Sequence, residues 1–421
     1  MQILRQENFT IPMEKRFQTQ KIPWLVFLFS ITIVLISFVS VVFPGIIQSS
    51  DITTILNIPK AGPNQYETGT WAAPLIITNV IMFGLFTAYK KDKLPKNIEN
   101  NLKKIFNFEI SKKTAFVTMI ILLGIYVTAS ANELSAEEKW EDYDGVKNRV
   151  DKWNVSQISD LGEPHVTYFF LKSSMVLFGS YKVIPFLASV SLLIVTYFIT
   201  KKITQKRFAG VISVIVILQS SLFLTYDTSV AYTNFWVLFY LLSLYFIYKF
   251  WSLSPISYLI SIPAKALTVM FLPMSIYFIL RSSISKKTKM IIIFSTVAII
   301  VAAGIVASGT DFTSGGSTKA ESFDAKDFWM GFTSFSYQLR FDGLVLLFMI
   351  PLISGLFILS KRGAKHAESI MVLISGMLLI APILTGFTNQ TNQPYRFMPL
   401  IVFFAIGVGV LLSKRETKTL V

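Results

Sequence analysis

The sequence lacks cysteine altogether and contains only two histidines among 421 residues. Without thiols the chain has no disulfide, no cysteine nucleophile and no zinc–thiolate site, and its redox compartment cannot be inferred. Charge is scarce too, because Asp, Glu, Lys and Arg make up 15% of the residues, whereas soluble domains contain about a quarter. A phosphate-cradling glycine loop, a HExxH zinc motif and a Ser–His–Asp set are also missing. These absences argue against an ordinary soluble enzyme.

Hydrophobic residues, by contrast, make up 53% of the chain. They form recurrent apolar runs of about 17 to 25 residues, each long enough to cross the hydrocarbon core as a helix. We therefore predict an all-α polytopic membrane protein with about twelve transmembrane helices. Two short helices that meet at Lys265 are expected within 254–281, because three prolines interrupt this stretch. The other expected spans are 22–45, 73–89, 114–131, 183–200, 208–226, 233–251, 290–307, 343–360, 368–387 and 396–413.

The net charge of +15 does not indicate nucleic-acid binding, because the basic residues gather between the apolar runs. Cytoplasmic loops of membrane proteins are enriched in Lys and Arg. This rule predicts a multi-pass protein of the cell membrane with both termini inside. The segments expected inside are 90–113, 201–207 and 361–366, and those expected outside are 133–181, 308–342 and 388–395.

We divide the chain into three regions. Residues 1–113 comprise the amino-terminal tail, two spans and a basic connector, 114–281 form a central core, and 282–421 carry the last spans. Within the connector, four apolar residues have the spacing of an amphipathic helix at the membrane interface: Ile98, Leu102, Ile105 and Phe106. The alternative is a solvated connector.

The outer loop 133–181 is the longest polar stretch between spans and is rich in carboxylates. If 140–153 is a helix, one apolar stripe runs along it, formed by Trp140, Tyr143, Val146, Val150 and Trp153. Such a helix is expected to lie on the membrane surface and to hold Glu141, Asp142 and Asp144 above the lipid. A partly buried carboxylate there can act as a general base. The alternative is a solvated acidic helix.

The carboxylates Asp142 and Asp144 also form a D-x-D triplet, which can hold a divalent cation such as Mg²⁺ or Mn²⁺. Whether a metal takes part stays open.

A few other polar residues lie at the expected ends of spans. His165 follows Pro164 and begins an apolar stretch that is too short to cross the membrane, so we expect a helix in the outer interface. Lys265 and Arg396 are cations suited to a phosphate head group. A plain helix start for His165 and an interfacial anchor for Arg396 are the alternatives.

The order of these features resembles the GT-C superfamily of integral-membrane glycosyltransferases. The acidic loop motif is followed by Pro-His-Val-Thr-Tyr-Phe-Phe-Leu at 164–171, which is similar to a juxtamembrane helix of that family. Ala264-Lys265-Ala266-Leu267-Thr268 follows in the expected order, and the segment 394–399 (PYRFMP) is similar to a signature before the last span. Asn234 stands where many relatives carry an aspartate, with Asp227 seven residues earlier.

The resemblance implies transfer of a hexosyl or pentosyl group from a polyprenyl-phosphate donor to a protein, lipid or glycan acceptor, at the extracytoplasmic face. It assigns Asp142 as the base, with Glu141 and Asp144 as alternatives. Its substrate-binding residues would be His165, Lys265, Arg396, Asp227 and Asn234. A transporter or channel, or a non-catalytic membrane subunit, is the alternative function.

Overall fold

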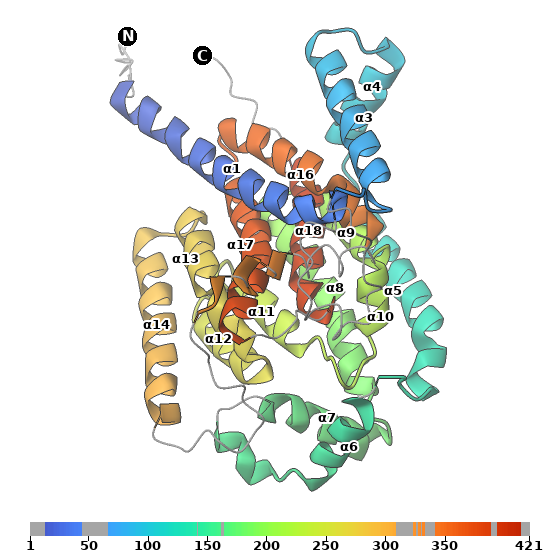
Figure 1. The fold of residues 1–421 in the computed structure, drawn as a ribbon, viewed down its shortest axis with the longest axis vertical. Helices are drawn as coiled ribbons and strands as arrows, with labels where there is room; N and C mark the ends of the chain where they lie inside the picture. The colour runs from blue at the N-terminus through green and yellow to red at the C-terminus, as the bar shows by residue number, and fades with distance from the viewer. Residues whose placement is uncertain are drawn as a thin grey trace, which may run out of the picture.

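The computed structural model describes residues 13–43, 66–140, 142–160, 164–308, 323–325, 327–329, 331–332, 342–388 and 394–413. Every regular element in these ranges is a helix (Figure 1). Seven of these helices are long and apolar enough to cross a membrane. The all-helical membrane architecture predicted from the sequence is therefore supported, while the number of twelve crossings stays a prediction.

Eight of the described helices agree with the expected spans, namely the seven just mentioned and α14 (Lys286–Ser308). They are α1 (Met13–Val42), α3 (Ala72–Lys90), α5 (Lys112–Ser135), α8 (Val183–Thr204), α14 (Lys286–Ser308), α16 (Gly343–Lys361), α17 (Lys365–Thr388) and α18 (Met398–Leu411), the last preceded by the 3₁₀ turn η5 (Pro394–Phe397).

Two expected spans are shorter or broken. The run 208–226 forms α9 (Arg207–Leu218) and α10 (Ser221–Tyr226), because Ser220 begins a new helix and its hydroxyl accepts a hydrogen bond from the amide of Phe223. The run 233–251 gives α11 (Phe235–Phe246), whose twelve residues are too few to cross about 30 Å of hydrocarbon.

The stretch 254–281 folds as two short arms around Lys265. The first arm, α12 (Leu253–Ala264), ends where Lys265 adopts an extended conformation, and η3 (Ala266–Phe271) and α13 (Leu272–Arg281) follow. Arg281 forms an ion pair with buried Glu368 near the start of α17, whereas Lys265 lies over Tyr395, which precedes α18. The chain therefore runs out along α12 and returns along α13, as the expected pair of short helices would.

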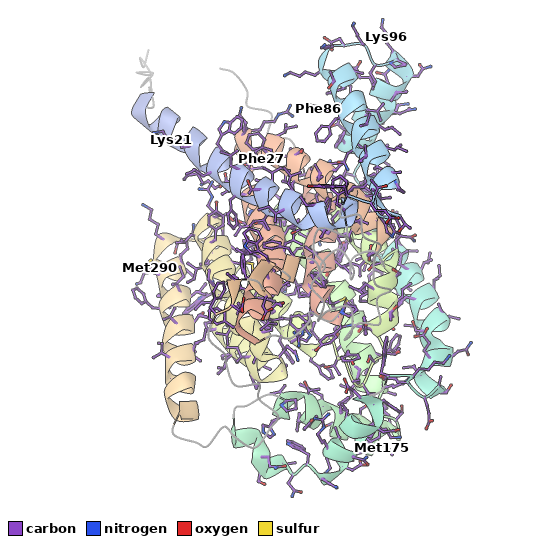
Figure 2. The ribbon with its side chains drawn as sticks, viewed as in Figure 1. Lys21, Phe27, Phe86, Lys96, Met175 and Met290 are labelled. Atoms are coloured by element: carbon purple, nitrogen blue, oxygen red, sulfur yellow. The ribbon has the colours of Figure 1, made fainter. Side chains whose placement is uncertain are left out.

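The core is centred on α18, which packs against α8, α9, α16 and α17. Gly409 allows this close packing, since a Cβ there would clash with the side chains of Ser213 on α9 and Thr200 on α8. At the periphery, α3 and α5 expose most of their apolar residues, and Figure 2 shows Phe86 pointing away from α3. Apolar surface of this kind is suited to lipid contact.

Two short amphipathic helices lie near opposite ends of the molecule (Figure 1). One is α4 (Lys96–Asn107), between α3 and α5. The other is α6 (Asp142–Lys152), which is followed by the 3₁₀ turn η2 (Val155–Asp160) and by α7 (His165–Phe178). We call α6 and α7 the α6–α7 layer.

Candidate functional site

A pocket of about 220 Å³ lies between the α6–α7 layer and the helical bundle. Segments far apart in the sequence line it: Asp142 on α6, Tyr168 on α7, Tyr232 before α11, Lys265 at the α12–η3 break, and Tyr395 before α18. Two of these residues, Asp142 and Lys265, were selected from the sequence as base and phosphate-binding cation. The fold brings them to one cavity.

The α6 helix carries Asp142 in its first turn, where a carboxylate interacts favourably with the helix dipole. Its side chains Val146 and Val150 are buried in a cluster with Trp153, Tyr168 and Leu171. At the other end of α6, Lys172 on α7 donates hydrogen bonds to the carbonyls of residues 151 and 153. The part of the expected stripe formed by Val146, Val150 and Trp153 therefore exists, and α7 packs against it.

Trp140 departs from the expected stripe. It precedes the start of α6, and its ring stacks on Tyr226 of α10 with centroids 5.3 Å apart. This tryptophan therefore anchors the loop to the bundle and not to α7.

The turn 227–234 forms one wall of the pocket and is held by Glu138, which the sequence did not distinguish from its acidic neighbours. The Glu138 carboxylate accepts hydrogen bonds from the amides of Val230 and Ala231 and from the hydroxyl of Ser229. Burial raises the pKa of Glu138, although these hydrogen bonds oppose the shift. The carboxylate thus fixes the backbone just before Tyr232.

Asp227 and Asn234 support the same turn from the bundle side and do not line the pocket. The Asn234 side-chain amide donates to the hydroxyl of Ser189 (3.1 Å), and Ser189 in turn donates to the carbonyl of Asp227 (2.7 Å). The Asp227 carboxylate accepts from Ser130 on α5 (3.1 Å). In this structure, the two residues expected to bind substrate hold the pocket wall in place.

Tyr232 links Asp142 to the far side of the pocket. Its hydroxyl donates to the Asp142 carboxylate at 2.8 Å, and its ring stacks on Tyr395 with centroids 4.4 Å apart. Burial, together with this hydrogen bond, raises the pKa of Tyr232, so the phenol stays protonated and acts as the donor. Asp142 itself is exposed, so its other lone pairs are open to a substrate.

Two cations lie beside Tyr395, the other ring of this stack. The Lys265 ammonium lies 5.6 Å and the Arg396 guanidinium 5.8 Å from the centre of the Tyr395 ring. Arg396 is half-buried, does not line the pocket, and its Nη1 atom has no hydrogen-bond partner among the described residues. The arrangement places a carboxylate beside Tyr232 and positive charge beside Tyr395, the two rings of one aromatic stack.

The remaining predicted residues lie elsewhere. Glu141 falls outside the described residues, and Asp144 is exposed and does not line the pocket. His165 begins α7 as expected, but its Nδ1 accepts a hydrogen bond from the indole of Trp153 (3.0 Å), which ties the start of α7 to the end of α6.

The described residues do not fit a divalent cation. Residues two apart on a helix point in directions about 200° apart, which separates the carboxylates of Asp142 and Asp144. No group of three or more acidic or histidine side chains suited to a metal occurs in the described ranges. The pocket wall also carries Lys265, whose charge repels a metal ion.

Comparisons of the chain with protein-family models, with curated proteins and with solved structures find no significant match. The geometry of the pocket is therefore the basis for a functional proposal.

Proposed function

We propose that this protein is a membrane glycosyltransferase that moves a sugar from a polyprenyl-phosphate donor to an acceptor at the face carrying the α6–α7 layer. The observation that supports the proposal most is the shared pocket of Asp142 and Lys265, with Arg396 beside it. Sugar transfer from a phosphate donor needs a base for the acceptor and fixed cations for the leaving phosphate. The pocket offers both.

In the proposed reaction, an acceptor hydroxyl or amide attacks the anomeric carbon of the donor with inversion. Asp142 takes the acceptor proton as the new bond to the sugar forms. The bond between the anomeric carbon and the phosphate oxygen breaks, and polyprenyl phosphate leaves as an anion near Lys265 and Arg396. Tyr232 orients the Asp142 carboxylate through its hydrogen bond.

The size of the pocket is compatible with a lipid-linked donor. About 220 Å³ is less than the roughly 300–1,000 Å³ of sites that enclose drug-sized ligands. It accommodates a sugar-phosphate head group, while the polyprenyl chain would stay in the bilayer. Apolar surface for that chain is available on α5, which exposes Ile121 and Ile125.

The test compares lipid-linked sugars and glycans in cells that lack the protein with those in cells complemented by variants produced at equal levels. We expect the deletion to accumulate a polyprenyl-phosphate sugar and the wild-type gene to remove it. The triple variant Glu141→Gln, Asp142→Asn, Asp144→Asn should fail to do so. Full complementation by this variant would contradict sugar transfer and favour a transporter or a structural subunit.

The cations are tested separately through donor affinity. Lys265→Ala and Arg396→Ala should each weaken donor binding by about 1.5–3 kcal/mol, since a hydrogen bond to a charged group contributes that much. An unchanged affinity for a synthetic polyprenyl-phosphate hexose in both variants would remove the phosphate site from the proposal.

A further inference from the structure

The amphipathic helix α4 presents a continuous apolar stripe. At 100° per residue, Ile98, Leu102, Ile105 and Phe106 fall within one arc of about 100°. The opposite side is polar and carries three lysines, Lys96, Lys103 and Lys104, together with several asparagines. The helix therefore has one face suited to an apolar medium and another suited to water.

Much of the apolar stripe is open on the described protein surface, and two of its residues, Leu102 and Phe106, are half-buried. Not one residue of α4 is buried, and Ile98 and Ile105 are 46% and 49% exposed. Only the carboxyl-terminal end of the helix is attached to the bundle, where Lys206 donates a hydrogen bond to the carbonyl of Phe106. Just beyond the helix, Glu109 accepts from the backbone amide of Arg207 at 3.0 Å. The exposed side chains of Ile98 and Ile105 are therefore open to a partner from outside the chain.

The position of α4 between two candidate spans indicates which partner this is. The helix joins the end of α3 at Lys90 to the start of α5 at Lys112 through short connections. If α3 and α5 both cross the bilayer, those two ends meet the same membrane face, and α4 has to lie at that face. Figure 2 shows Lys96 at the far end of the molecule from Met175 on α7.

Charge defines the partner further. Six lysines lie on or next to α4: Lys90, Lys91, Lys93, Lys96, Lys103 and Lys104. Anionic phospholipids attract such basic segments beside a membrane span. Long lysine side chains can reach the head groups while the apolar side of the helix enters the acyl boundary.

We infer that α4 is an interfacial helix bound to an anionic lipid surface, with its apolar stripe in the lipid and its lysines at phospholipid head groups. It holds the connector between α3 and α5 against the leaflet at the end of the molecule opposite the pocket. This inference is independent of the proposed sugar transfer.

The experiment uses the absence of native cysteine. Single cysteines at Ile98 and Ile105, and matched controls at Asn100 and Asn107 on the polar side, are labelled with bimane in the full-length protein. The protein is reconstituted in vesicles of phosphatidylcholine and phosphatidylglycerol with brominated acyl chains. Emission from positions 98 and 105 should be blue-shifted and quenched about twofold or more relative to positions 100 and 107. Equal quenching on both sides would overturn the inference.

Two further measurements separate the other possible occupants. If a second copy covers the stripe, Ile105→Cys proteins will cross-link to each other and the label will escape the brominated lipid, which contradicts lipid binding. Replacing phosphatidylglycerol by phosphatidylcholine should reduce the difference in quenching between the two sides. The triple variant Lys96→Gln, Lys103→Gln, Lys104→Gln should reduce it as well. Quenching that ignores both changes would overturn the role of anionic head groups.

Discussion

The helices α4 and α6 are nearly equal in length, both are charged and amphipathic, and both lie between a candidate span and the next apolar helix. Their apolar sides nevertheless end in different surroundings. Val146 and Val150 of α6 are buried against α7, whereas Ile98 and Ile105 of α4 remain about half exposed. Periodicity identifies the apolar side of a helix, but it does not say whether protein or lipid covers that side.

The difference follows from what surrounds each helix in the chain. After α6, the chain returns as α7, whose Tyr168 and Leu171 form a surface complementary to the valines. After α4, only four residues separate Asn107 from Lys112, and the next helix leaves as a candidate span. A covered helix can hold a carboxylate against a partner such as Tyr232, while an uncovered helix is free to meet lipid.

The largest expected effect concerns catalysis at the covered helix. Asp142→Asn removes the proposed base and should lower turnover by about 10²–10⁴-fold, because a general base contributes that much. On the connector between α3 and α5, Asp92→Asn removes a comparable exposed carboxylate and should leave turnover unchanged. Turnover is measured as polyprenyl phosphate released by the reconstituted protein.

Asp144→Asn is the matched control within α6, because Asp144 is exposed and does not line the pocket. A large loss from Asp144→Asn with a small loss from Asp142→Asn would move the base within the motif. Equal losses from Asp142→Asn and Asp92→Asn would remove the functional contrast between the two helices.

The second prediction tests the packing contrast with two leucines. Leu171→Ala creates a cavity beneath α6 and should cost about 2–5 kcal/mol of stability, since Leu171 is fully buried. Leu102→Ala on α4 removes the same atoms from a half-buried position and should cost the detergent-solubilised protein less, about 1 kcal/mol. Thermal unfolding and proteolysis between residues 142 and 178 measure the two effects. Similar losses would mean that α4 packs against the protein after all.

Much of the fold could be predicted from the sequence because long apolar runs and helix-terminating residues are local signals. The start of α7 at His165 and the break at Lys265 are examples. The division of 208–226 into α9 and α10 was missed, because the cap at Ser220 resembles any serine in an apolar run. The shortness of α11 was also missed, since hydropathy alone does not mark where Phe246 ends the helix.

The site could be predicted only in part, for a different reason. Asp142 and Lys265 were selected by their charge near an expected membrane face, and this signal is visible in the sequence. Glu138, Tyr232 and Tyr395 act through contacts between segments about 90 or more residues apart, so no local pattern identifies them. One weak signal for Tyr395 was present in the sequence, namely the similarity of the segment 394–399 to a signature before the last span.

A third, smaller effect is expected from the carboxylates that bind backbone amides at each end of the molecule. Glu138→Ala leaves the buried amides of Val230 and Ala231 without an acceptor, which should cost about 1–3 kcal/mol locally. Amide hydrogen exchange in the turn 227–234 should accelerate, and turnover should fall. Glu138→Gln keeps one acceptor oxygen and should lie between wild type and Glu138→Ala.

The counterpart on the connector between α3 and α5 is Glu109. Its carboxylate accepts a hydrogen bond from the backbone amide of Arg207 and lies 3.8 Å from the guanidinium of that residue. This pair is exposed, so Glu109→Ala should cost about 0–1 kcal/mol and leave turnover intact. If Glu109→Ala cost as much stability as Glu138→Ala, the contact that attaches the end of α4 to the bundle would be as strong as the one that holds the pocket wall.

The smallest effect is a dependence of stability on pH that arises from Asp227 at the pocket end of the molecule. Burial raises the pKa of Asp227, in the turn between α10 and α11, to about 6, well above the usual value of about 3.9. Because the folded state binds this proton more tightly than the unfolded state, the contribution is present at low pH and is lost as the pH rises through about 6. Between pH 5.5 and 7.5 the protein should lose about 1 kcal/mol of stability from this group. Asp227→Asn should remove that part of the slope, and the difference between the two pH profiles of thermal unfolding isolates the contribution of Asp227. Parallel profiles for wild type and Asp227→Asn would show that the buried carboxylate does not take up a proton on folding.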